Sequence, residues 1–380
     1  MSEIAPLRIC LFLSHFYPRE SGAERQARAQ AVELVKRGHQ VRVLTRHIKG
    51  LPKDETIEGV HIHRWINPST RGPLFGATFV FDAVRALRTL RPKYDLIHTH
   101  QALWEAISTG AGRDFFSNAP ILIQPASSGY FGEAEELART KGVSILRRLV
   151  LRNPYFAAIS ADIETQWKKL GVPPEKIFRM ASGVDAEQFK PGPSTVEFNL
   201  PNRPRVLFTG RLHPQKNIDL LLDAWPGVIN RLPNASLLLI GDGPDRARLE
   251  TKAREAGLLD SLRFLGAVAD PAEWLRAGDA FVLPSVAEGM SNSLLEALAS
   301  ALPCLATDIG GNTDLIRPEK DGLLLPANDP NAWTLALIRV LADRDFAAKL
   351  GQAARAKIET EFALPVVVDR YVALYRRLIK

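Results

Sequence analysis

Short apolar runs alternate with amphipathic stretches along most of the chain. Residues 8–14 are nearly all apolar, as in a strand buried on both faces of a parallel sheet. Ser21 to Glu24 then predicts the start of a helix, which Gly38 ends. Later strand-like runs in the first half lie at 41–45, 60–65, 95–100, 121–124, 155–160 and 176–180, with helix-like stretches near 74–90, 133–150 and 162–170. This alternation predicts a doubly wound parallel sheet, in which ligands bind beyond the carboxyl ends of the strands.

The alternation lapses between residues 191 and 204, which are rich in proline and poor in apolar periodicity. We interpret this stretch as a linker between a first domain, residues 1–190, and a second domain, residues 205–365. Strand-like runs resume near 205–209, 236–241, 262–265, 280–284, 303–307 and 322–325, with helix-like stretches near 217–231, 244–256, 291–301 and 329–342. The second domain is therefore expected to be a second doubly wound sheet, and residues 346–379 to be all-helical.

The length and composition suit two globular cores, because the chain has 380 residues of which 46% are hydrophobic. Cys10 and Cys304 both fall in apolar runs, which favours core thiols in a reducing compartment over a disulfide. The first residues do not resemble a signal peptide, and no apolar run approaches the roughly 18 residues needed to span a bilayer. We expect a cytoplasmic protein, either free or peripheral on the inner face of the membrane.

The net charge of +7 comes from the first half. Residues 1–190 carry 27 Lys and Arg against 19 Asp and Glu, whereas residues 191–380 carry 22 against 23. The basic residues gather in two sets: Arg85, Arg88, Arg91 and Lys93, and Arg139, Lys141, Arg147, Arg148 and Arg152. The second set is interspersed with apolar residues, which suits an anionic membrane surface, while a solvated helix face is the alternative. The sequence contains no recognised nucleic-acid-binding motif.

The stretch from Pro284 to Glu296 joins a strand end, a loop of small residues and a helix start. This layout binds anions, because free amides and the positive end of the helix face whatever lies beyond the strand. Serine and asparagine can cap the helix, and glycine lets the backbone approach a ligand closely. The residues expected to line this cradle are Gly289, Met290, Ser291 and Asn292.

Two carboxylates frame the same loop, Glu288 before it and Glu296 within the helix. Like charges repel, so carboxylates beside a phosphate site are better suited to accept hydrogen bonds from sugar hydroxyls than to contact phosphate. The alternative places Glu288 in a solvated turn and Glu296 on a solvated helix face.

The motifs of this region resemble the donor-site signature of the retaining glycosyltransferase family 4. The residues that carry the resemblance are Pro284-Ser285, Glu288-Gly289, Leu295-Glu296-Ala297 and Gly310-Gly311. The likeness extends over nearly the whole chain and is most specific between residues 205 and 316. It implies the GT-B fold: two Rossmann-like domains that face each other across a cleft, with the acceptor on the first, the donor on the second, and residues 366–380 crossing back to the first domain.

Arg211 and Lys216 lie between the first strand and the first helix of the second domain. They are therefore placed at a sheet edge, where a guanidinium and an ammonium can bind a diphosphate. In the matching family motif these two cations hold the donor diphosphate, and two solvated loop cations are the alternative.

Residues 17–25 form the corresponding loop of the first domain, where the family usually has two consecutive glycines. This chain has Ser21 and Gly22, so Gly22 retains the close backbone approach to diphosphate or acceptor, whereas Ser21 restricts it. An ordinary helix cap is the alternative interpretation. After the strand 121–124, Ala126 stands where many relatives have a histidine, and the small residues Ser127 to Gly129 are candidates for the acceptor side instead.

Gly241 and Gly243 follow a strand, but Arg246 occupies the third glycine position of the dinucleotide fingerprint, so an oxidoreductase is not indicated. In the family this turn and the strand that contains Leu265 flank the nucleotide base. His98 and His100 share a strand face without further ligands at metal spacing, so no metal site is predicted, although His100 at the strand end could face the cleft.

The resemblance implies a metal-independent retaining transferase without a cofactor, because the nucleotide sugar is its substrate. It would move a hexose-type sugar from a UDP-sugar, favoured over a GDP-sugar, to a glycan or lipid-linked acceptor in polysaccharide or glycolipid synthesis. Two alternatives stay open: a sugar-nucleotide epimerase or phosphorylase on the same fold, and a non-catalytic nucleotide-sugar-binding partner subunit. Acceptor dependence, phosphate dependence and turnover would separate them.

Overall fold

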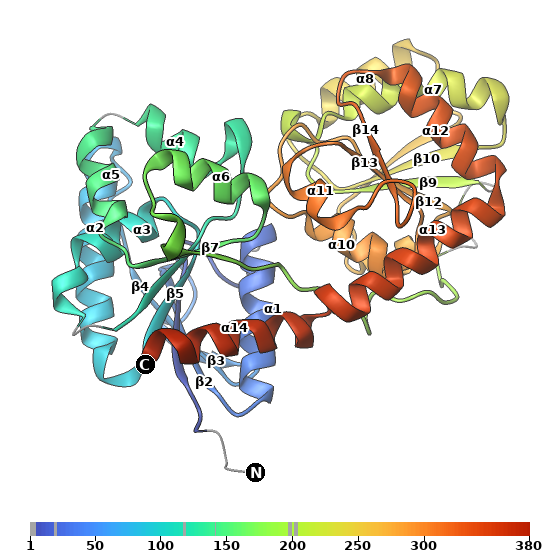
Figure 1. The fold of residues 1–380 in the computed structure, drawn as a ribbon. Coiled ribbons are helices and arrows are strands. Elements are labelled where there is room, and N and C mark those ends of the chain that lie inside the picture. The colour runs from blue at the N-terminus through green and yellow to red at the C-terminus, as the bar shows by residue number, and fades with distance from the viewer. Residues whose placement is uncertain (1–4, 19–20, 117–118, 141, 197–199, 201–203) are drawn as a thin grey trace. The chain divides into compact units, whose positions relative to one another are not determined.

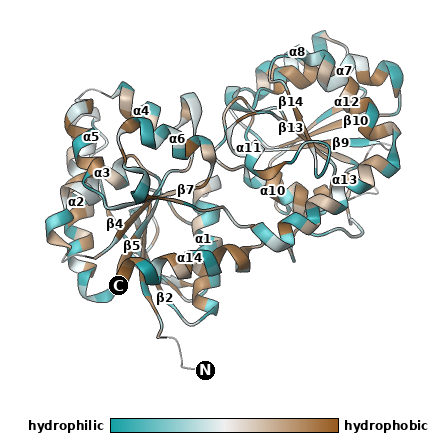
Figure 2. Ribbon diagram, in the orientation of Figure 1, coloured by the Kyte–Doolittle hydropathy of each residue, from teal (hydrophilic) through white to brown (hydrophobic). Residues whose placement is uncertain are grey.

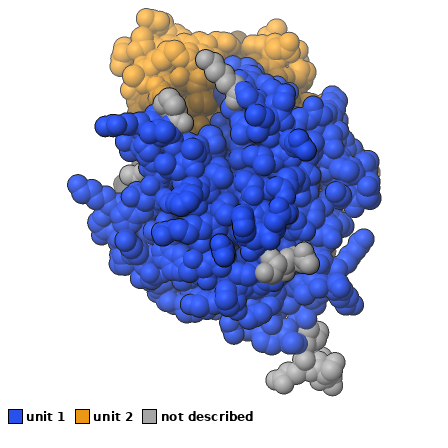
Figure 3. All heavy atoms as spheres, turned by 90° about the vertical axis from the view of Figure 1, so that its left-hand side faces the viewer, with its two compact units in different colours: residues 1–183, 364–380 blue, residues 184–363 orange. Residues whose placement is uncertain are grey.

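The computed structural model describes residues 5–18, 21–116, 119–140, 142–196, 200 and 204–380 (Figure 1). The chain forms two compact units, coloured separately in Figure 3. Unit 1 comprises residues 1–183 and 364–380, and unit 2 comprises residues 184–363. The stretch 191–204, predicted as a linker, belongs to unit 2, and its residues 197–199 and 201–203 lie outside the described residues.

Unit 1 is built on an eight-stranded sheet with the order β3-β4-β2-β1-β5-β6-β7-β8. Its strands are β1 (Arg8–Phe12), β2 (Gln40–Arg46), β3 (Asp54–Ile57), β4 (Val60–Ile66), β5 (Leu96–His100), β6 (Ile121–Gln124), β7 (Tyr155–Ala158) and β8 (Ile177–Arg179). All neighbouring strands are parallel except the edge pair β3 and β4. The central strands are buried on both faces, which explains their continuous apolar runs.

Helices cover both faces of this sheet, and the apolar strands lie between them in Figure 2. The helices are α1 (Gly22–Lys36), α2 (Gly72–Leu90), α3 (Trp104–Ala111), α4 (Glu133–Arg139), α5 (Val143–Leu151), α6 (Ala161–Leu170) and α14 (Leu364–Ile379). Helix α1 packs against α14, and α3 packs against both α2 and α5. Sheet and helices together form a doubly wound layer structure, as predicted.

Helix α14 is anchored in unit 1 by buried polar side chains. The Tyr375 hydroxyl lies 2.7 Å from Nδ1 of His98, and the Tyr371 hydroxyl donates to Oε1 of Gln124 at 2.6 Å. Nε2 of Gln30, on α1, donates to the Tyr375 hydroxyl at 3.1 Å. The C-terminal segment therefore contributes to the core of unit 1 rather than covering its surface.

Unit 2 contains a six-stranded parallel sheet with the order β11-β10-β9-β12-β13-β14. Its strands are β9 (Arg205–Thr209), β10 (Ser236–Ile240), β11 (Leu262–Gly266), β12 (Ala280–Leu283), β13 (Cys304–Thr307) and β14 (Leu323–Leu325). Its helices are α7 (Ile218–Arg231), α8 (Arg246–Glu255), α9 (Pro271–Arg276), α10 (Asn292–Ala299), α11 (Gly310–Leu315), α12 (Pro330–Ala342) and α13 (Arg344–Lys357). The predicted second doubly wound sheet is thus present.

One local prediction was wrong, and several short elements were missed. Residues 133–150 form two helices, α4 and α5, because Gly142 has a φ of +79° and caps the start of α5 in the left-handed region. Strand β3 was not predicted, since a polar edge strand carries no apolar run. The eight-residue helix α3 was also missed, because its buried face is too short to give a clear period. Among the described helices, none is both long enough and apolar enough to cross a bilayer.

Candidate active site

The candidate site lies at the carboxyl edge of the unit 2 sheet, where the strand order reverses. Strands β9 and β12 are neighbours, but the chain runs from β9 towards β11 and from β12 towards β14. In open parallel sheets this switch point is where ligands bind, because the loops that follow the two strands diverge there. The loops concerned are residues 210–217 after β9 and 284–291 after β12.

The loop after β9 is held by glycine-to-backbone contacts. A Cβ on Gly241 would come within 1.9 Å of the Gly210 carbonyl oxygen, and Gly241 has a φ of +135°. The Gly210 amide donates to the Ile240 carbonyl at 2.9 Å, and the Leu212 amide donates to the Asp242 carbonyl at 2.9 Å. Arg211 projects from this fixed segment, is exposed, and makes no ion pair within the described residues. A cation available at a rigid sheet edge suits an anionic ligand.

Gln215 joins the two loops of the switch point. Its carbonyl accepts the Val286 amide at 2.9 Å, and its side-chain amide donates to the Ala287 carbonyl at 2.8 Å. Sequence reasoning missed Gln215, although it lies inside the motif that contains Arg211 and Lys216, because nothing in that motif indicates its partner. It fixes the spacing between the predicted cations and Glu288.

Lys216 and Glu288 form a direct ion pair across the two loops. Nζ of Lys216 lies 2.5 Å from Oε1 of Glu288, and the side chains are only 17% and 8% exposed. Glu288 is buried and Lys216 is partly buried, so the ion pair compensates part of the cost of removing these charges from water. The structure thus brings together two residues that were predicted for separate parts of the donor.

Helix α10 begins at the end of the second loop. Ser291 is its N-cap, and its hydroxyl accepts the Leu294 amide at 3.4 Å. Glu296 and Ser293, both within the helix, are buried, and so is the N-cap Ser291. The alternative of solvated positions for Glu288 and Glu296 is therefore wrong for their side chains, since both are less than a tenth exposed. Glu288 before α10 and Glu296 within it thus place two hydrogen-bond acceptors close to the amide donors at the start of the helix.

Gly311 supports the cradle from α11. A Cβ at Gly311 would come within 1.8 Å of the Gly289 carbonyl oxygen, so only glycine fits there. The buried side chain of Asn312 donates to the Thr307 carbonyl at 3.0 Å and fixes the start of α11. The double glycine identified in the sequence therefore supports the backbone around Gly289.

Gly241 and Leu265 come from the next two strands. Gly241 follows β10 directly, its amide donates to the Gly266 carbonyl at 2.7 Å, and Leu265 lies in the neighbouring strand β11. Both are at the same carboxyl edge as Arg211 and Glu288, one and two strands away from β9. The predicted residues of unit 2 therefore occupy a single edge of one sheet.

Gly22 belongs to unit 1, where it is the first residue of α1. The Ser21 amide donates to Oε2 of Glu24 at 2.8 Å, and the Ser21 hydroxyl donates to the same carboxylate. The helix cap that was the alternative interpretation is therefore present as a capping box, which leaves the role of the Gly22 backbone open. Residues 19–20 of this loop lie outside the described residues.

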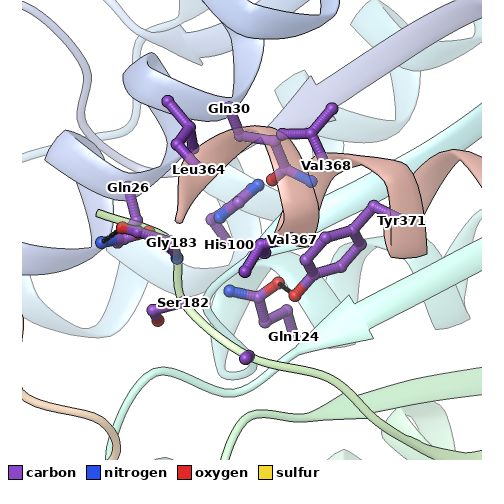
Figure 4. A pocket seen from close by; sticks show the side chains of 11 residues that line it. Gln26, Gln30, His100, Gln124, Ser182, Gly183, Leu364, Val367, Val368 and Tyr371 are labelled. Atoms are coloured by element: carbon purple, nitrogen blue, oxygen red, sulfur yellow. Dashed lines mark hydrogen bonds between the residues drawn. The ribbon is translucent and has the colours of Figure 1, made fainter. Parts of the chain in front are cut away.

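His98 and His100 are both buried in unit 1, with ring centroids 4.4 Å apart. His100 lines a cavity of about 10 Å³ in unit 1, room for about one water. Figure 4 shows its ring between Gln30 and Gly183. Neither ring nitrogen has a hydrogen-bond partner within the described residues, and burial lowers the pKa of His100 to about 3. The described residues contain no cluster of three or more histidine, cysteine, aspartate or glutamate side chains arranged for a metal.

Two family models match the chain. The model described as Glycosyltransferase Family 4 matches residues 21–188, and the one described as Glycosyl transferases group 1 matches residues 203–343. The first model falls within unit 1 except for its last residues, and the second falls within unit 2.

Named relatives agree with these models. The chain is 31% identical over 303 residues to the UDP-Gal:alpha-D-GlcNAc-diphosphoundecaprenol alpha-1,3-galactosyltransferase of Escherichia coli, covering 75% of this chain and 76% of the relative. It is 28% identical over 267 residues to a GDP-mannose-dependent alpha-(1-6)-phosphatidylinositol monomannoside mannosyltransferase of Mycobacterium tuberculosis, covering 63% and 69%. The structure of sucrose-phosphate synthase from Thermosynechococcus elongatus superposes with a TM-score of 0.84 at 25% identity, over 97% and 98% of the two chains. The chain therefore belongs to glycosyltransferase family 4 and has the GT-B fold.

Proposed function

We propose that this glycosyltransferase transfers a hexose from a nucleotide diphosphate sugar to an acceptor hydroxyl with retention of the anomeric configuration. The observation that carries the proposal is the ion pair of the half-buried Lys216 with the buried Glu288, beside the exposed Arg211, at the switch point of the unit 2 sheet. One charge of each sign, fixed side by side, suits a ligand that presents a diphosphate next to a hydroxylated ring.

Arg211 and Lys216 would bind the diphosphate and stabilise the negative charge that it gains as the bond to the sugar breaks. The amides of Gly289 to Ser291, at the start of α10, would add uncharged donors to the same oxygens. Two cations and a helix end compensate the charge of the leaving group, which is why we propose transfer without a metal ion. Loss of one such stabilising group costs on the order of 3 kcal/mol in the transition state.

Glu288 would accept hydrogen bonds from the hydroxyls of the sugar, and Glu296 from those of the ribose. Both carboxylates are buried, so an unfilled site leaves Glu288 paired with Lys216, and the donor would substitute for part of that pairing. Gly241 and Leu265 would flank the base, and Gly22 of unit 1 would offer its backbone to the diphosphate or acceptor.

In the proposed reaction the acceptor oxygen bonds to the anomeric carbon as the bond to the phosphate oxygen breaks on the same face. The proton of the acceptor hydroxyl passes to the departing phosphate, so no protein base is required. Closing the site against water would protect the donor from hydrolysis, which is the competing reaction.

A UDP-sugar is the favoured donor, because the E. coli relative named for UDP-Gal is 31% identical, whereas the relative named for GDP-mannose is 28% identical over a shorter region. Both names specify an acceptor carried on a lipid. We therefore propose a glycan intermediate on a lipid carrier as the acceptor, in polysaccharide or glycolipid synthesis.

A lipid acceptor agrees with the basic surface of unit 1. Helices α2 and α5 lie on one side of the sheet, the side that faces the reader in Figure 3. Phe81 on α2 is 68% exposed and Ile145 on α5 is 70% exposed, with exposed Arg85 and Arg148 on the same helices. We propose that this side contacts an anionic membrane surface. Lys141, another member of the basic set, lies outside the described residues.

Vesicle binding tests the membrane contact separately. An R147E/R148E variant should lose cosedimentation with vesicles that contain phosphatidylglycerol, and added salt should weaken the binding of the wild type. Binding that is equal on neutral vesicles would contradict the contact.

The test of the donor site is a thermal-shift panel of UDP, GDP and ADP, followed by hydrolysis of the matching sugar nucleotides. A ligand at a hundredfold excess over its dissociation constant stabilises the folded state by about 2.7 kcal/mol. UDP alone should shift the melting temperature, and Glu288→Ala should abolish hydrolysis and transfer while the protein still folds. A folded Glu288→Ala variant with full activity, or no shift with any nucleotide, would refute the site. Conversion of donor without acceptor, or a requirement for inorganic phosphate, would point to an epimerase or a phosphorylase.

A further inference from the structure

The unit 1 sheet has its own switch point, between β1 and β5, because the strand order reverses there. The loops that follow β1, β5 and β6 leave the same carboxyl edge, since these strands are adjacent and parallel. Two buried glutamates, Glu105 and Glu133, lie beneath these loops.

Glu105 stands in the first turn of α3 and is 1% exposed. The hydroxyl of Ser14, in the loop after β1, donates to Oε1 of Glu105 at 2.5 Å. Burial raises the pKa of Glu105 to about 7, with a further contribution from the charge of Glu133. The carboxyl group therefore links the loop after β1 to the helix after β5.

Glu133 is the first residue of α4 and is also buried. Its two carboxylate oxygens accept the backbone amides of Ala126 at 2.7 Å and Ser127 at 3.0 Å. Gly132 closes the same loop, because a Cβ there would come within 2.9 Å of the Ser127 carbonyl oxygen. The loop after β6 is thus fixed by hydrogen bonds at the amides of Ala126 and Ser127 and by the close approach of Gly132 to the Ser127 carbonyl.

Neither glutamate forms an ion pair within the described residues. A buried carboxyl without a cation is costly, and a neutral side chain could fill either position at lower cost. Both carboxyl groups instead accept hydrogen bonds from loops at the sheet edge where a ligand of unit 1 would lie. This placement is difficult to explain by folding stability alone.

We infer that Glu105 and Glu133 are positioning residues for the acceptor, Glu105 through the hydroxyl of Ser14 and Glu133 through the amides of Ala126 and Ser127. The inference rests on the proposed function, in which unit 1 takes the acceptor. Neither glutamate contacts the acceptor; each fixes a loop that does.

The first experiment compares Glu105→Met, which removes the acceptor of the Ser14 hydrogen bond, with Glu105→Gln, which keeps it. The assay measures transfer from the UDP-sugar to GlcNAc diphosphate carried on a short alkyl chain. We expect the KM for this acceptor to rise about tenfold or more in Glu105→Met, because the hydroxyl of the bound acceptor would be misplaced. Glu105→Gln should restore most of the affinity and remove the limb of the pH profile near pH 7.

A double-variant cycle with Ser14→Ala sharpens the test. If both residues act through one hydrogen bond, the S14A/E105M pair will be no worse than either single variant, whereas independent roles give additive losses. For Glu133, Glu133→Gln turns one acceptor into a donor that faces a backbone amide, so the acceptor KM should rise and the amides of Ala126 and Ser127 should exchange hydrogen faster. The exposed Glu135→Gln on the same helix is the matched control.

The UDP thermal shift and the hydrolysis of donor without acceptor separate this inference from the proposed function. Both depend mainly on the donor site of unit 2, so they should stay near wild type in the Glu105→Met and Glu133→Gln variants. Their absence in the wild type would defeat the proposed function. The inference is overturned if Glu105→Met and Glu133→Gln leave the acceptor KM and loop exchange unchanged, or if hydrolysis and transfer fall in parallel.

Discussion

The loops at the carboxyl edge of the unit 1 sheet and those at the carboxyl edge of the unit 2 sheet are fixed by different kinds of contact. In unit 2 the loops are fixed mainly backbone to backbone, with Gly241 against Gly210 and Gly311 against Gly289, and the side chain of Gln215 adds one hydrogen bond. In unit 1 the loops are fixed by buried side chains, with Glu105 and Glu133 accepting hydrogen bonds from Ser14 and from the loop after β6. A backbone-fixed edge gives a precise cradle for one constant group, whereas a side-chain-fixed edge can change with a single substitution. The first suits a donor diphosphate and the second suits an acceptor.

The largest effect should come from charge removal in the backbone-fixed edge. Lys216→Ala is expected to reduce transfer about a hundredfold, on the order of 3 kcal/mol, because the leaving diphosphate loses one cation. It should also lower the melting temperature, since the buried Glu288 carboxylate loses the cation with which it pairs. The double variant K216M/E288Q removes both charges and should regain stability without regaining activity. Kinetics and thermal melts of the two proteins check this, and a fully active Lys216→Ala variant would refute the assigned role.

The next effect concerns the glycine contacts. Gly311→Ala places a Cβ 1.8 Å from the Gly289 carbonyl oxygen, so the loop must move. We expect a loss of about 1–3 kcal/mol of unfolding free energy and a weaker UDP shift. Gly192→Ala is the control, because its nearest neighbour would be 3.8 Å away. Equal behaviour of the two variants in denaturant titrations would show that the close contact does not fix the cradle.

The pH dependence of stability should differ between the units. Burial lowers the pKa of His98 and of His100, whose ordinary value is 6.5, so both stay neutral in folded unit 1 while the unfolded chain binds protons below pH 6.5. Their contribution is complete above pH 6.5 and falls with pH, by up to about 1.4 kcal/mol per pH unit for each histidine. Glu105 opposes this between pH 7 and 4.5, because its folded pKa is raised to about 7, and Glu133 opposes it too, because burial raises the pKa of its carboxyl group.

Burial also lowers the pKa of His39 and of His63, so the net expectation is that unit 1 weakens from pH 6.5 towards pH 5. His100→Phe removes the histidine whose two ring nitrogens have no hydrogen-bond partner in the described chain. This variant should show a weaker dependence of stability on pH. Hydrogen exchange of the α14 amides at pH 7.5 and pH 5.5 measures it. The same slope in wild type and variant would contradict the assignment to His100.

The smallest expected change is in thiol reactivity. Cys10 lies in unit 1 and Cys304 in unit 2, both fully buried, and burial raises the pKa of Cys10 to about 12. Neither native thiol should react with a maleimide at pH 7. Each single variant keeps one thiol, so maleimide labelling in mild denaturant reports the opening of unit 2 in Cys10→Ala and of unit 1 in Cys304→Ala. Rapid labelling of native protein would show that one of the cores opens locally.

The strands of both sheets, apart from the polar edge strand β3, were predictable because they are buried runs whose limits coincide with loss of apolar character. Strand β6 was predicted at residues 121–124 and β9 at residues 205–209, as the structure has them. The break at Gly142 was not predictable from periodicity, since apolar residues continue on both sides of it. The short helices α9 and α11 were missed for a related reason, because six residues do not establish a period.

The residues of the candidate sites likewise divide into those that a local motif predicted and those that only the fold brings together. Arg211, Lys216 and Glu288 were found because a local motif carries them, although their roles remain predictions. Glu105 and Glu133 were not found, because a carboxylate in a helical stretch is ordinarily solvated and only the fold brings Glu105 to Ser14, 91 positions earlier. Gln215 was passed over because its partners lie 71 and 72 positions away.

The anchoring of α14 has a consequence for biosynthesis. Unit 1 begins the chain but needs Tyr371 and Tyr375 to complete the hydrogen bonds of His98 and Gln124. These tyrosines leave the ribosome only after all of unit 2. Unit 2 can fold from a continuous segment while synthesis proceeds, whereas the first half of the chain must wait with part of its apolar core uncovered. Expression of this protein should therefore depend on chaperones that bind nascent unit 1, and a chain that stops at residue 363 should aggregate even though unit 2 is complete.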